Sequence, residues 1–325
     1  MSLPRRPRPP RLRHRTATTA ATIVLAGATL ALGVPAANAS IAVPGAQATG
    51  AHRADGSHPD VVWARTVSGR MVRLAKPRFT PTPVRPEKIT HPGRDFMGST
   101  VASHLKGAAR ATRASTVPAL PGIDVSAYQG NINWPGIARY LDFAYAKASE
   151  GTYYTNPDFY NQYVGPYNAG LIRGAYQFAI PNNSSGQSQA DYFIRHGGGW
   201  SADGKTLPGA LDIEYNPYGS ECYGLTDSQM VSWLHNFANE YAFREHVYPV
   251  IYSTTDWWST CTGNSSGFSS KDPLWVANYS ASHGGTLPRG WGFYTFWQYR
   301  SSGSLPGDQD VFNGAYKQLR ALAKG

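Results

Sequence analysis

The 325-residue chain has few cysteines, and none of them is placed for metal binding. Cys222 and Cys261 are the two present, and neither belongs to a Cys-x-x-Cys or a His-x-x-x-His pattern, which argues against the usual zinc cages. The histidines of the C-terminal part show no ligand spacing either; they are His196, His235, His246 and His283. We therefore expect no metal and no cofactor.

Charge is also scarce, since Asp, Glu, Lys and Arg make up 15% of the chain. The net charge of +10 is unevenly divided: residues 1–118 hold 18 Lys and Arg against 4 Asp and Glu, and residues 119–325 hold 12 against 16. The C-terminal part is mildly acidic as a result. This balance argues against nucleic acid as its partner.

Long apolar runs are absent after the N-terminus. The first residues are rich in arginine, and the apolar stretch that follows, Ala21 to Val34, is shorter than the roughly 20 residues that span a bilayer. Ala37-Asn38-Ala39 then supplies the small residues of a cleavage site. We predict a signal peptide over 1–39, with Arg5-Arg6 leaving a twin-arginine route open, and a secreted protein without a stable membrane anchor.

In an exported protein, two cysteines favour a disulfide. We predict a bond between Cys222 and Cys261, the alternative being two buried thiols.

Residues 40–118 contain much Pro, Gly, Ala, Ser, Thr and Arg and little that could form a core. We interpret them as a largely disordered propeptide or spacer, with a short hairpin from Val61 to Val72 as one exception. Its positive charge could hold the protein near anionic wall polymers. A solvated linker with no binding role is the alternative.

The sequence pattern changes after Pro118, where apolar strand-like runs alternate with helix-like segments. Expected strands cover 122–126, 143–149, 172–179, 209–215, 248–254, 274–279, 293–299 and a short run near Val311; expected helices cover 134–141, 157–169, 186–196 and 227–244. Such alternation predicts a parallel sheet, and the helices shrink towards the C-terminus. Residues 119–325 are therefore expected to form one irregular (β/α) barrel.

Four acidic residues fall at expected strand ends: Asp124, Asp212, Glu214 and Asp308. The reactive groups of a parallel barrel lie at the carboxyl ends of its strands, where the loops form an open mouth. Asp212 and Glu214 are two residues apart, which places both side chains on one face of a strand. Burying two charges on one face is costly, and that cost favours a functional role.

Neighbouring carboxylates suit the hydrolysis of a glycosidic bond. One carboxyl protonates the leaving oxygen while the other stabilises the positive charge that develops on the sugar, and burial and repulsion separate their pKa values. Asp-x-Glu alone is a common tripeptide, so a surface strand end and a divalent metal site remain alternatives.

Aromatic residues recur near the expected strand ends, where flat rings can stack on sugars. We expect five of them to line the cleft and bind substrate: Tyr176, Tyr215, Trp275, Tyr279 and Trp297.

Several ordered motifs resemble the lysozymes of glycoside hydrolase family 25 over residues 120–325. They are Gly122-Ile123-Asp124-Val125-Ser126, the run from Phe143 to Gly151, Gly174-Ala175-Tyr176-Gln177-Phe178, Leu211-Asp212-Ile213-Glu214, Trp275-Val276-Ala277-Asn278-Tyr279, Trp297-Gln298-Tyr299 and the run from Asp308 to Gly314. One residue departs from the family pattern, because Gln177 stands where the third strand usually has histidine.

The resemblance implies an irregular (β/α)5(β)3 TIM-like barrel and a muramidase that cleaves the β-1,4 bond between N-acetylmuramic acid and N-acetylglucosamine in bacterial peptidoglycan. It implies that Glu214 is the general acid/base and that Asp212 assists the 2-acetamido group. Asp124 and Asp308 would complete the acidic cleft. We expect a secreted monomer, with cell-wall association left open. Chitin hydrolysis, or sugar binding without turnover, are the rival functions.

Overall fold

The computed structural model describes residues 61–65, 71–75, 89–104, 119–281 and 283–325. The predicted signal peptide, 1–39, lies outside the described residues, as does much of the predicted spacer. Within the spacer, β1 (Val61–Arg65) pairs antiparallel with β2 (Met71–Ala75), and Trp63 lies opposite Arg73. The short hairpin expected there is confirmed.

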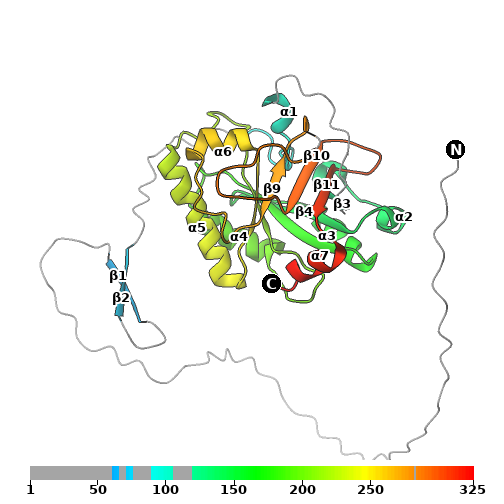
Figure 1. Ribbon diagram of the computed structural model, residues 1–325, viewed down its shortest axis with the longest axis horizontal. Helices are drawn as coiled ribbons and strands as arrows, with labels where there is room; N and C mark the ends of the chain where they lie inside the picture. Colours follow the sequence, from blue (N-terminus) through cyan, green and yellow to red (C-terminus); the bar gives the residue numbers. More distant parts are fainter. Residues whose placement is uncertain (1–60, 66–70, 76–88, 105–118, 282) are drawn as a thin grey trace, which may run out of the picture. The chain divides into compact units, whose positions relative to one another are not determined.

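Eight strands close into a barrel (Figure 1). Around the ring they are β3 (Ala119–Val125), β4 (Phe143–Glu150), β6 (Ile172–Phe178), β7 (Ala210–Asp212), β8 (Val250–Ser253), β9 (Leu274–Ala277), β10 (Phe296–Arg300) and β11 (Asp308–Asn313). Neighbours from β3 to β10 run parallel, whereas β11 is antiparallel to both β10 and β3. The short β5 (Tyr154–Thr155) pairs with the end of β4.

A helix follows each of the first five barrel strands. These helices are α2 (Trp134–Ile137), α3 (Phe159–Asn168), α4 (Gly186–Phe193), α5 (Asp227–Glu245) and α6 (Thr255–Thr262). Between β9, β10 and β11 the described residues form no helix, and α7 (Tyr316–Leu322) ends the chain. The irregular (β/α)5(β)3 barrel is confirmed. The remaining helix, α1 (Val101–His104), precedes the barrel in the sequence.

Helix α5 begins where its sequence predicts. Thr226 accepts a hydrogen bond from the backbone N–H of Gln229, and the Gln229 side chain accepts one from the backbone N–H of Thr226. This reciprocal capping satisfies two of the unpaired donors at a helix start.

Helix α6 was not expected from the sequence, because its run Thr255–Thr262 contains β-branched and aromatic residues with low helix propensity. Packing against α5 overrides that preference.

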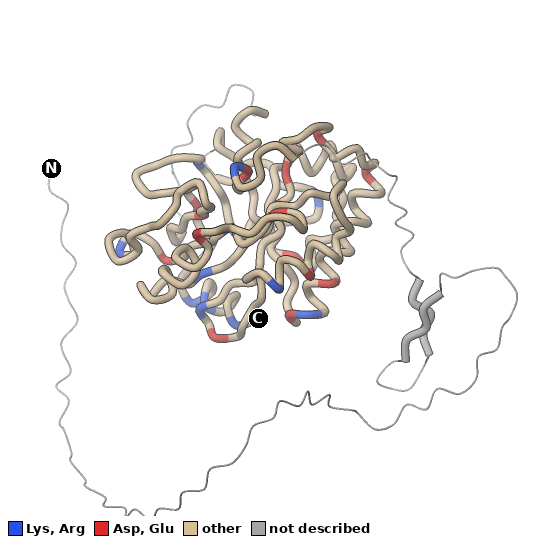
Figure 2. The backbone as a smooth tube through the Cα atoms, turned by 180° about the vertical axis from the view of Figure 1, so that it is seen from behind, with Lys and Arg blue, Asp and Glu red and all other residues tan. Residues whose placement is uncertain are grey.

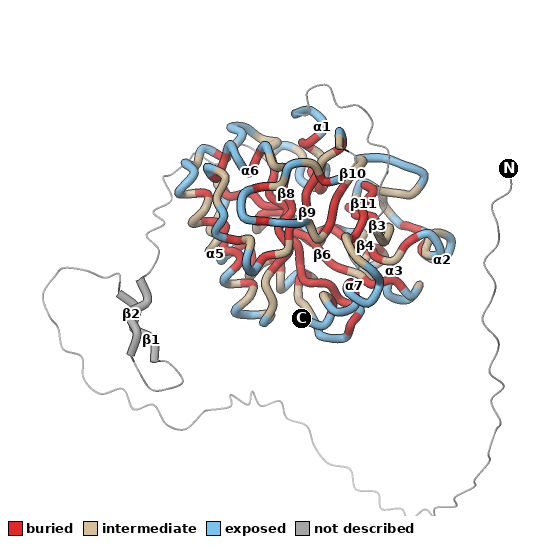
Figure 3. The backbone as a smooth tube through the Cα atoms, viewed as in Figure 1, coloured by how far each residue is buried: buried red, intermediate tan, exposed pale blue. Residues whose placement is uncertain are grey.

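The strands are buried along most of their length, and the helices expose their outer faces (Figure 3). All eight residues of β4 are buried, as are all four of β8 and β9. Helices cover one face of these strands and barrel side chains cover the other, which explains their nearly continuous apolar sequence. A layer of aromatic side chains fills the barrel interior; it contains Phe143, Tyr145, Tyr252, Trp275 and Phe296.

The predicted disulfide is present. Cys222, in the connection after β7, is bonded to Cys261 in α6, and the two Cα atoms are 5.3 Å apart. The bond ties a loop beside the strand ends to a helix on the barrel wall. It closes a loop with a sequence separation of 39 residues.

Replacing both cysteines with alanine is expected to lower the free energy of unfolding by about 3–4 kcal/mol, because the unfolded chain gains the entropy that the crosslink removes. Urea denaturation of the two proteins measures this loss. Ser259→Ala, an exposed change on the same helix, is the control and should cost under about 1 kcal/mol. A double-alanine chain as stable as the parent would contradict the prediction.

Several Lys and Arg positions gather around the C-terminus, at the end of the barrel opposite α1 (Figures 1 and 2).

Among the described residues, no helix combines the length and apolar character that crossing a membrane requires.

Candidate active site

The four acidic residues expected in the site meet at one end of the barrel. Asp124, near the end of β3, lies opposite Asp308 at the start of the antiparallel β11. Asp212 is the last residue of β7, and Glu214 follows two residues later, beyond the strand. All four side chains are buried. The fold therefore brings the four strand-end carboxylates together, as the sequence predicted.

A fifth carboxylate, Asp310, belongs to the same cluster. It is buried on β11, two residues beyond Asp308, and its charge raises the pKa of Tyr279 beside the other acids. Asp310 Oδ1 accepts a hydrogen bond of 3.1 Å from the indole N–H of Trp275. Asp310 was not expected in the site, although the alternation of side chains along β11 places it on the same face as Asp308.

The carboxylates lie on the aromatic layer of the barrel interior. The ring of Trp275 is 4.8 Å from that of Tyr145 and 5.3 Å from that of Phe296. This floor and the surrounding strands remove water from the acids, and a carboxylate in such a place favours its neutral form.

The pKa values of the cluster are raised accordingly. Burial raises the pKa of Asp124 and of Glu214 to about 7. Burial, followed by the charge of Glu214, raises the pKa of Asp212 well above its ordinary value. For Asp308 and Asp310 the pKa is raised by burial and then by the charge of Asp124. A group that holds its proton near neutral pH is what general acid catalysis requires.

Several carboxylate oxygens of the cluster accept no hydrogen bond from an N–H or hydroxyl donor of the described residues, although Asp212 pairs with the carboxyl of Glu214 and Asp310 with that of Asp124. They are both oxygens of Asp212 and the Oδ2 atoms of Asp308 and Asp310. Buried polar atoms are usually paired, so these atoms mark a place where a ligand can bind. Within the described part of the chain, no group of His, Cys, Asp and Glu side chains is arranged to hold a metal ion.

Gln298 on β10 connects the acids to the barrel wall. Its Nε2 donates to Asp124 Oδ2 at 2.7 Å, and its Oε1 accepts from the hydroxyls of Tyr252 and Tyr279, both at 2.6 Å. These bonds fix the orientation of the amide and, through it, of Asp124. Gln298 belongs to the motif Trp297-Gln298-Tyr299 but was not expected in the site.

A cation also lies inside the barrel. Lys147 on β4 is fully buried and forms an ion pair of 2.6 Å with Glu150. Its charge lowers the pKa of Asp212, against the larger effects of burial and Glu214 that raise it. A lysine within the buried run Phe-Ala-Tyr-Ala-Lys-Ala-Ser-Glu was a usable signal, because an unpaired charge there would be costly.

Three of the five aromatic residues expected to line the cleft lie near the carboxylates. The charges of Asp124 and Asp212 act on the pKa of Tyr176, and those of Asp308 and Glu214 on that of Tyr279. Tyr215 directly follows Glu214, and its hydroxyl donates to Asp256 at 2.8 Å.

The two tryptophans are placed differently from the expectation. Trp275 belongs to the aromatic floor beneath Asp310 and is fully buried. Trp297 points to the outer side of β10, opposite to Gln298, and donates its indole N–H to Asn278 O at 2.8 Å. Neither ring is available at the surface of a cleft.

Gln177 also faces away from the acids. Its Oε1 accepts from Ser149, and its Nε2 donates to Gly151 O and to Gln189 Oε1 on α4. The side chain therefore lies between the barrel and α4. A glutamine at this position has no contact with the carboxylates.

Residues 89–104 belong to the spacer that was expected to be largely disordered, but they are folded against the site. The backbone N–H groups of Gly98 and Thr100 donate to Glu214 Oε1 and Oε2 at 2.7 and 3.1 Å, and the Thr100 hydroxyl donates to Oε2 as well. These bonds lower the pKa of Glu214, against the larger effect of burial.

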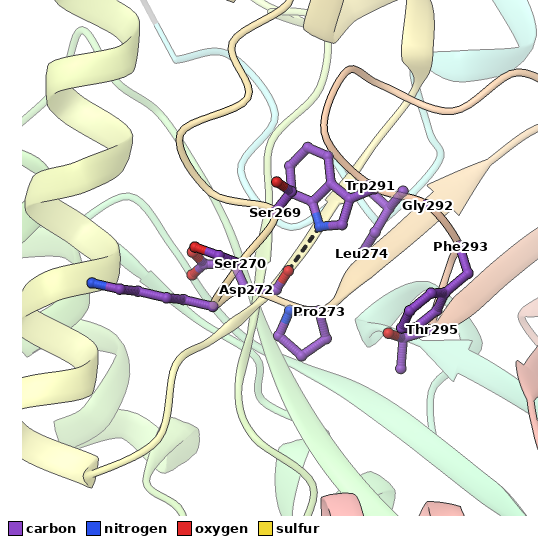
Figure 4. A pocket seen from close by; sticks show the side chains of 10 residues that line it. Ser269, Ser270, Asp272, Pro273, Leu274, Trp291, Gly292, Phe293 and Thr295 are labelled. Atoms are coloured by element: carbon purple, nitrogen blue, oxygen red, sulfur yellow. Dashed lines mark hydrogen bonds between the residues drawn. The ribbon is translucent and has the colours of Figure 1, made fainter.

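A hollow lies at the other end of the barrel (Figure 4). It is lined by Asp272, Pro273, Trp291 and Phe293, among others, next to Leu274 at the start of β9. Trp291 donates its indole N–H to Asp272 O at 2.9 Å. Burial raises the pKa of Asp272 to about 8, but this acid lies alone, whereas glycoside hydrolysis uses paired carboxyls.

The raised pKa values predict how pH changes stability. An acid whose pKa is higher in the folded chain binds more protons there, so its contribution to stability is present below the unfolded pKa of about 4 and is lost as pH rises through the folded pKa. The Asp308→Asn side chain is neutral at every pH. At pH 8 its free energy of unfolding, measured by urea denaturation, should exceed that of the parent by on the order of 1–3 kcal/mol. At pH 4 the two free energies should be similar.

The control for that comparison is Asp158→Asn. Asp158 precedes α3 and its side chain makes no capping hydrogen bond. This variant should follow the parent within about 0.5 kcal/mol. Equal stability of the parent and Asp308→Asn at pH 8 would show that burial does not disfavour the ionised Asp308.

Known proteins are similar to this chain in sequence and in the barrel fold. The sequence model described as Glycosyl hydrolases family 25 matches residues 123–308. "Lysozyme M1" of Streptomyces globisporus is 44% identical over 269 residues, which are 79% of this chain and 91% of that protein. "N,O-diacetylmuramidase" of Chalaropsis sp is 44% identical over 208 residues, covering 63% of this chain and 99% of that protein.

A solved structure agrees with these matches. The muramidase from Acremonium alcalophilum superposes with a TM-score of 0.62 and 53% identity, covering 63% of this chain and 99% of that one. The family match includes Asp124, Asp212, Glu214 and Asp308, the four acids expected from the sequence. The chain belongs to glycosyl hydrolases family 25.

Proposed function

We propose that the chain is an exported muramidase that hydrolyses the β-1,4 bond between N-acetylmuramic acid and N-acetylglucosamine in bacterial peptidoglycan. The observation that carries this proposal is the pair of buried acids after β7, Asp212 and Glu214, in a barrel of this family. The names of the similar proteins, lysozyme and N,O-diacetylmuramidase, support peptidoglycan as the substrate class.

Glu214 acts first as the acid. With a pKa of about 7, it holds a proton near neutral pH and gives it to the glycosidic oxygen as the bond to the anomeric carbon breaks. The carbonyl oxygen of the substrate's own 2-acetamido group attacks that carbon from the opposite face. The product of this step is a cyclic oxazolinium, and the aglycone leaves with the proton of Glu214.

Asp212 stabilises this intermediate. Its two oxygens accept no hydrogen bond from an N–H or hydroxyl donor of the described residues, so one of them can accept the acetamido N–H while the carboxylate offsets the positive charge on the ring. Burial and the charge of Glu214 raise the pKa of Asp212, and the charge of Lys147 lowers it. The positive charge of Lys147 and the neutral, protonated state of Glu214 are therefore what favour the ionised Asp212 that this role needs. Glu214, now a carboxylate, then takes a proton from a water molecule. The oxygen of that water attacks the anomeric carbon, the bond from this carbon to the acetamido oxygen breaks, the acetamido group is restored and the configuration is retained.

The remaining acids position the substrate. Asp124 is held by Gln298, and Asp308 lies opposite Asp124 in the β3–β11 ladder. The hydroxyls of Tyr176 and Tyr279 border the same space. Chemically, this set offers several hydrogen-bond acceptors for sugar hydroxyls beside two phenol groups.

Digestion of purified peptidoglycan, with and without 6-O-acetyl groups, followed by mass spectrometry of the products tests the proposal. Products with N-acetylmuramic acid at the reducing end are expected from both walls. Crystalline chitin is the comparison substrate and should yield little soluble sugar. Products that end in N-acetylglucosamine, or faster digestion of chitin, would contradict the proposal, and binding without products would favour a sugar-binding protein.

A further inference from the structure

Residues 89–104, which we call the plug segment, lie where the substrate would have to bind. Glu214 Oε1 accepts from the N–H of Gly98 and Oε2 from the N–H and hydroxyl of Thr100. We propose that the plug segment is an intramolecular inhibitor, which fills the glycan cleft and holds hydrolysis at a low basal rate until the segment is displaced or removed. The proposal rests on the proposed function of the same site.

The hydrogen bonds at Glu214 are incompatible with its role as an acid. A catalytic acid must hold a proton and direct it to the glycosidic oxygen at hydrogen-bond distance. In the structure both oxygens accept bonds from the plug segment, and these bonds lower the pKa of Glu214 against the effect of burial, which favours the ionised form that cannot donate a proton. The leaving oxygen of a glycan and the amide of Gly98 compete for the same position.

The plug segment also occupies aromatic surfaces that a sugar would use. The ring of His104 stacks on Tyr215 with the ring centres 3.7 Å apart and the planes 6° from parallel. The Tyr176 hydroxyl accepts from the N–H of Met97 at 3.2 Å. Stacking on a ring and bonding to a phenol are the contacts by which a cleft of this kind holds a pyranose, and here they are already made.

The fit is close at Gly98. Its φ of +88° is in the left-handed region, and a Cβ there would collide with the Tyr279 hydroxyl and lie 2.6 Å from Gln298 Oε1 and 2.8 Å from Asp308 Oδ2. Only glycine brings its backbone this close without strain. The sequence of the plug segment is thus matched to the acidic cluster.

Further contacts anchor the segment on both sides of Gly98. Met97 and Val101 are fully buried in the same apolar cluster as Tyr176 and Trp275. The carbonyl of Asp95 accepts from the Lys147 ammonium, and its carboxylate accepts from Tyr218. The segment therefore covers the catalytic acids, fills the apolar space above them and uses the buried lysine.

One of the similar proteins corresponds to the barrel alone, whereas the match to "Lysozyme M1" covers 79% of this chain and therefore extends beyond residues 119–325. The Chalaropsis relative is matched over 99% of its length by 63% of this chain, about the share that residues 119–325 represent. A catalytic unit of that family accordingly has no need of residues 89–104 for its fold.

The test uses the full chain and its Gly98→Leu variant, in which the side chain cannot fit against Tyr279. Hydrogen–deuterium exchange should show the amides of Gly98 and Thr100 protected in the parent and exposed in the variant. Release of reducing ends from purified peptidoglycan should be at least about tenfold faster for the variant. Gly170→Ala is the matched control, because Gly170 has a φ of +90° but no neighbour within 4 Å, and its rate should equal that of the parent.

A synthetic peptide of residues 89–104 provides a second measurement, which does not depend on how the variant folds in detail. Added to the Gly98→Leu chain, it should restore inhibition at high concentration, because the tethered segment has the advantage of an effective concentration near millimolar. The same peptide carrying Gly98→Leu should not inhibit.

The outcomes separate this proposal from the proposed function. Unprotected amides in the parent would overturn the plug, whatever the enzyme does, and so would equal, measurable hydrolysis by parent and Gly98→Leu. Exposed amides with no hydrolysis of any wall by the variant would contradict the muramidase assignment. In that case, binding of a soluble N-acetylglucosamine oligomer tests whether the plug segment blocks the cleft. Tighter binding by the variant than by the parent supports the inhibitor proposal, and equal binding overturns it.

Discussion

Glu214→Gln is expected to slow peptidoglycan hydrolysis by about 10²–10⁴-fold, the usual contribution of a general acid and base. A glutamine amide keeps the size of the side chain but cannot donate a proton to the leaving oxygen or take one from water. The measurement is the rate of reducing-end release in the Gly98→Leu background, where the plug segment does not limit the rate. Thermal unfolding of the same protein checks that it remains folded.

Glu240→Gln is the matched control for this change. Glu240 lies on α5, where it contacts Arg244 at 3.8 Å and Gln187 at 3.0 Å, and pairs of this kind at the surface contribute little. Its variant should hydrolyse walls at the parental rate. Near-parental activity of Glu214→Gln would remove Glu214 from the role of acid/base.

Asp212→Asn is expected to lower the same rate by about 10²–10³-fold, or roughly 3–4 kcal/mol of transition-state stabilisation. Asparagine retains one acceptor but loses the charge that offsets the oxazolinium. Because the loss is confined to the transition state, kcat should fall more than KM changes. A rise in KM with kcat nearly unchanged would instead indicate a binding role.

The control for Asp212→Asn is Asp272→Asn. Asp272 is also buried and also has a raised pKa, but it lies at the other end of the barrel, before β9. If the two variants lost activity equally, the effect would come from removing a buried charge in general and not from the position of Asp212.

Much of the site was accessible from the sequence because the chemistry is concentrated in a few acidic residues at strand ends. Asp124, Asp212, Glu214 and Asp308 stand out in runs that are otherwise apolar, and the fold brings them together. Asp310 and Gln298 were missed. On β11 and β10 both faces of the strand are buried, so alternation alone does not tell which polar residue faces the interior.

The same ambiguity explains the two tryptophans. Trp275 and Trp297 belong to strands β9 and β10, and both rings are buried, one inside the barrel and one outside it. In the sequence each is an aromatic residue near a strand end. Their direction is set by the register between β9 and β10, in which Phe296 lies beside Trp275, and register is a property of the assembled sheet.

Local sequence therefore determined the alternating order of strands and helices, the start of α5 at Thr226 and the presence of the acidic pair. It also supplied the two cysteines that the fold brings together. These features depend on neighbouring residues, on hydrophobic spacing or on the count of a rare residue type, and all of these are visible along the chain.

The tertiary structure alone decided that residues 89–104 lie against Glu214. The bonds that place them there come chiefly from the backbone N–H groups of Gly98 and Thr100, and every residue except proline has such a group. No side-chain pattern therefore signals the contact, and the partners are more than 110 positions apart in the chain. Only the folded barrel, by gathering its acids at one end, gives those amides something to bind.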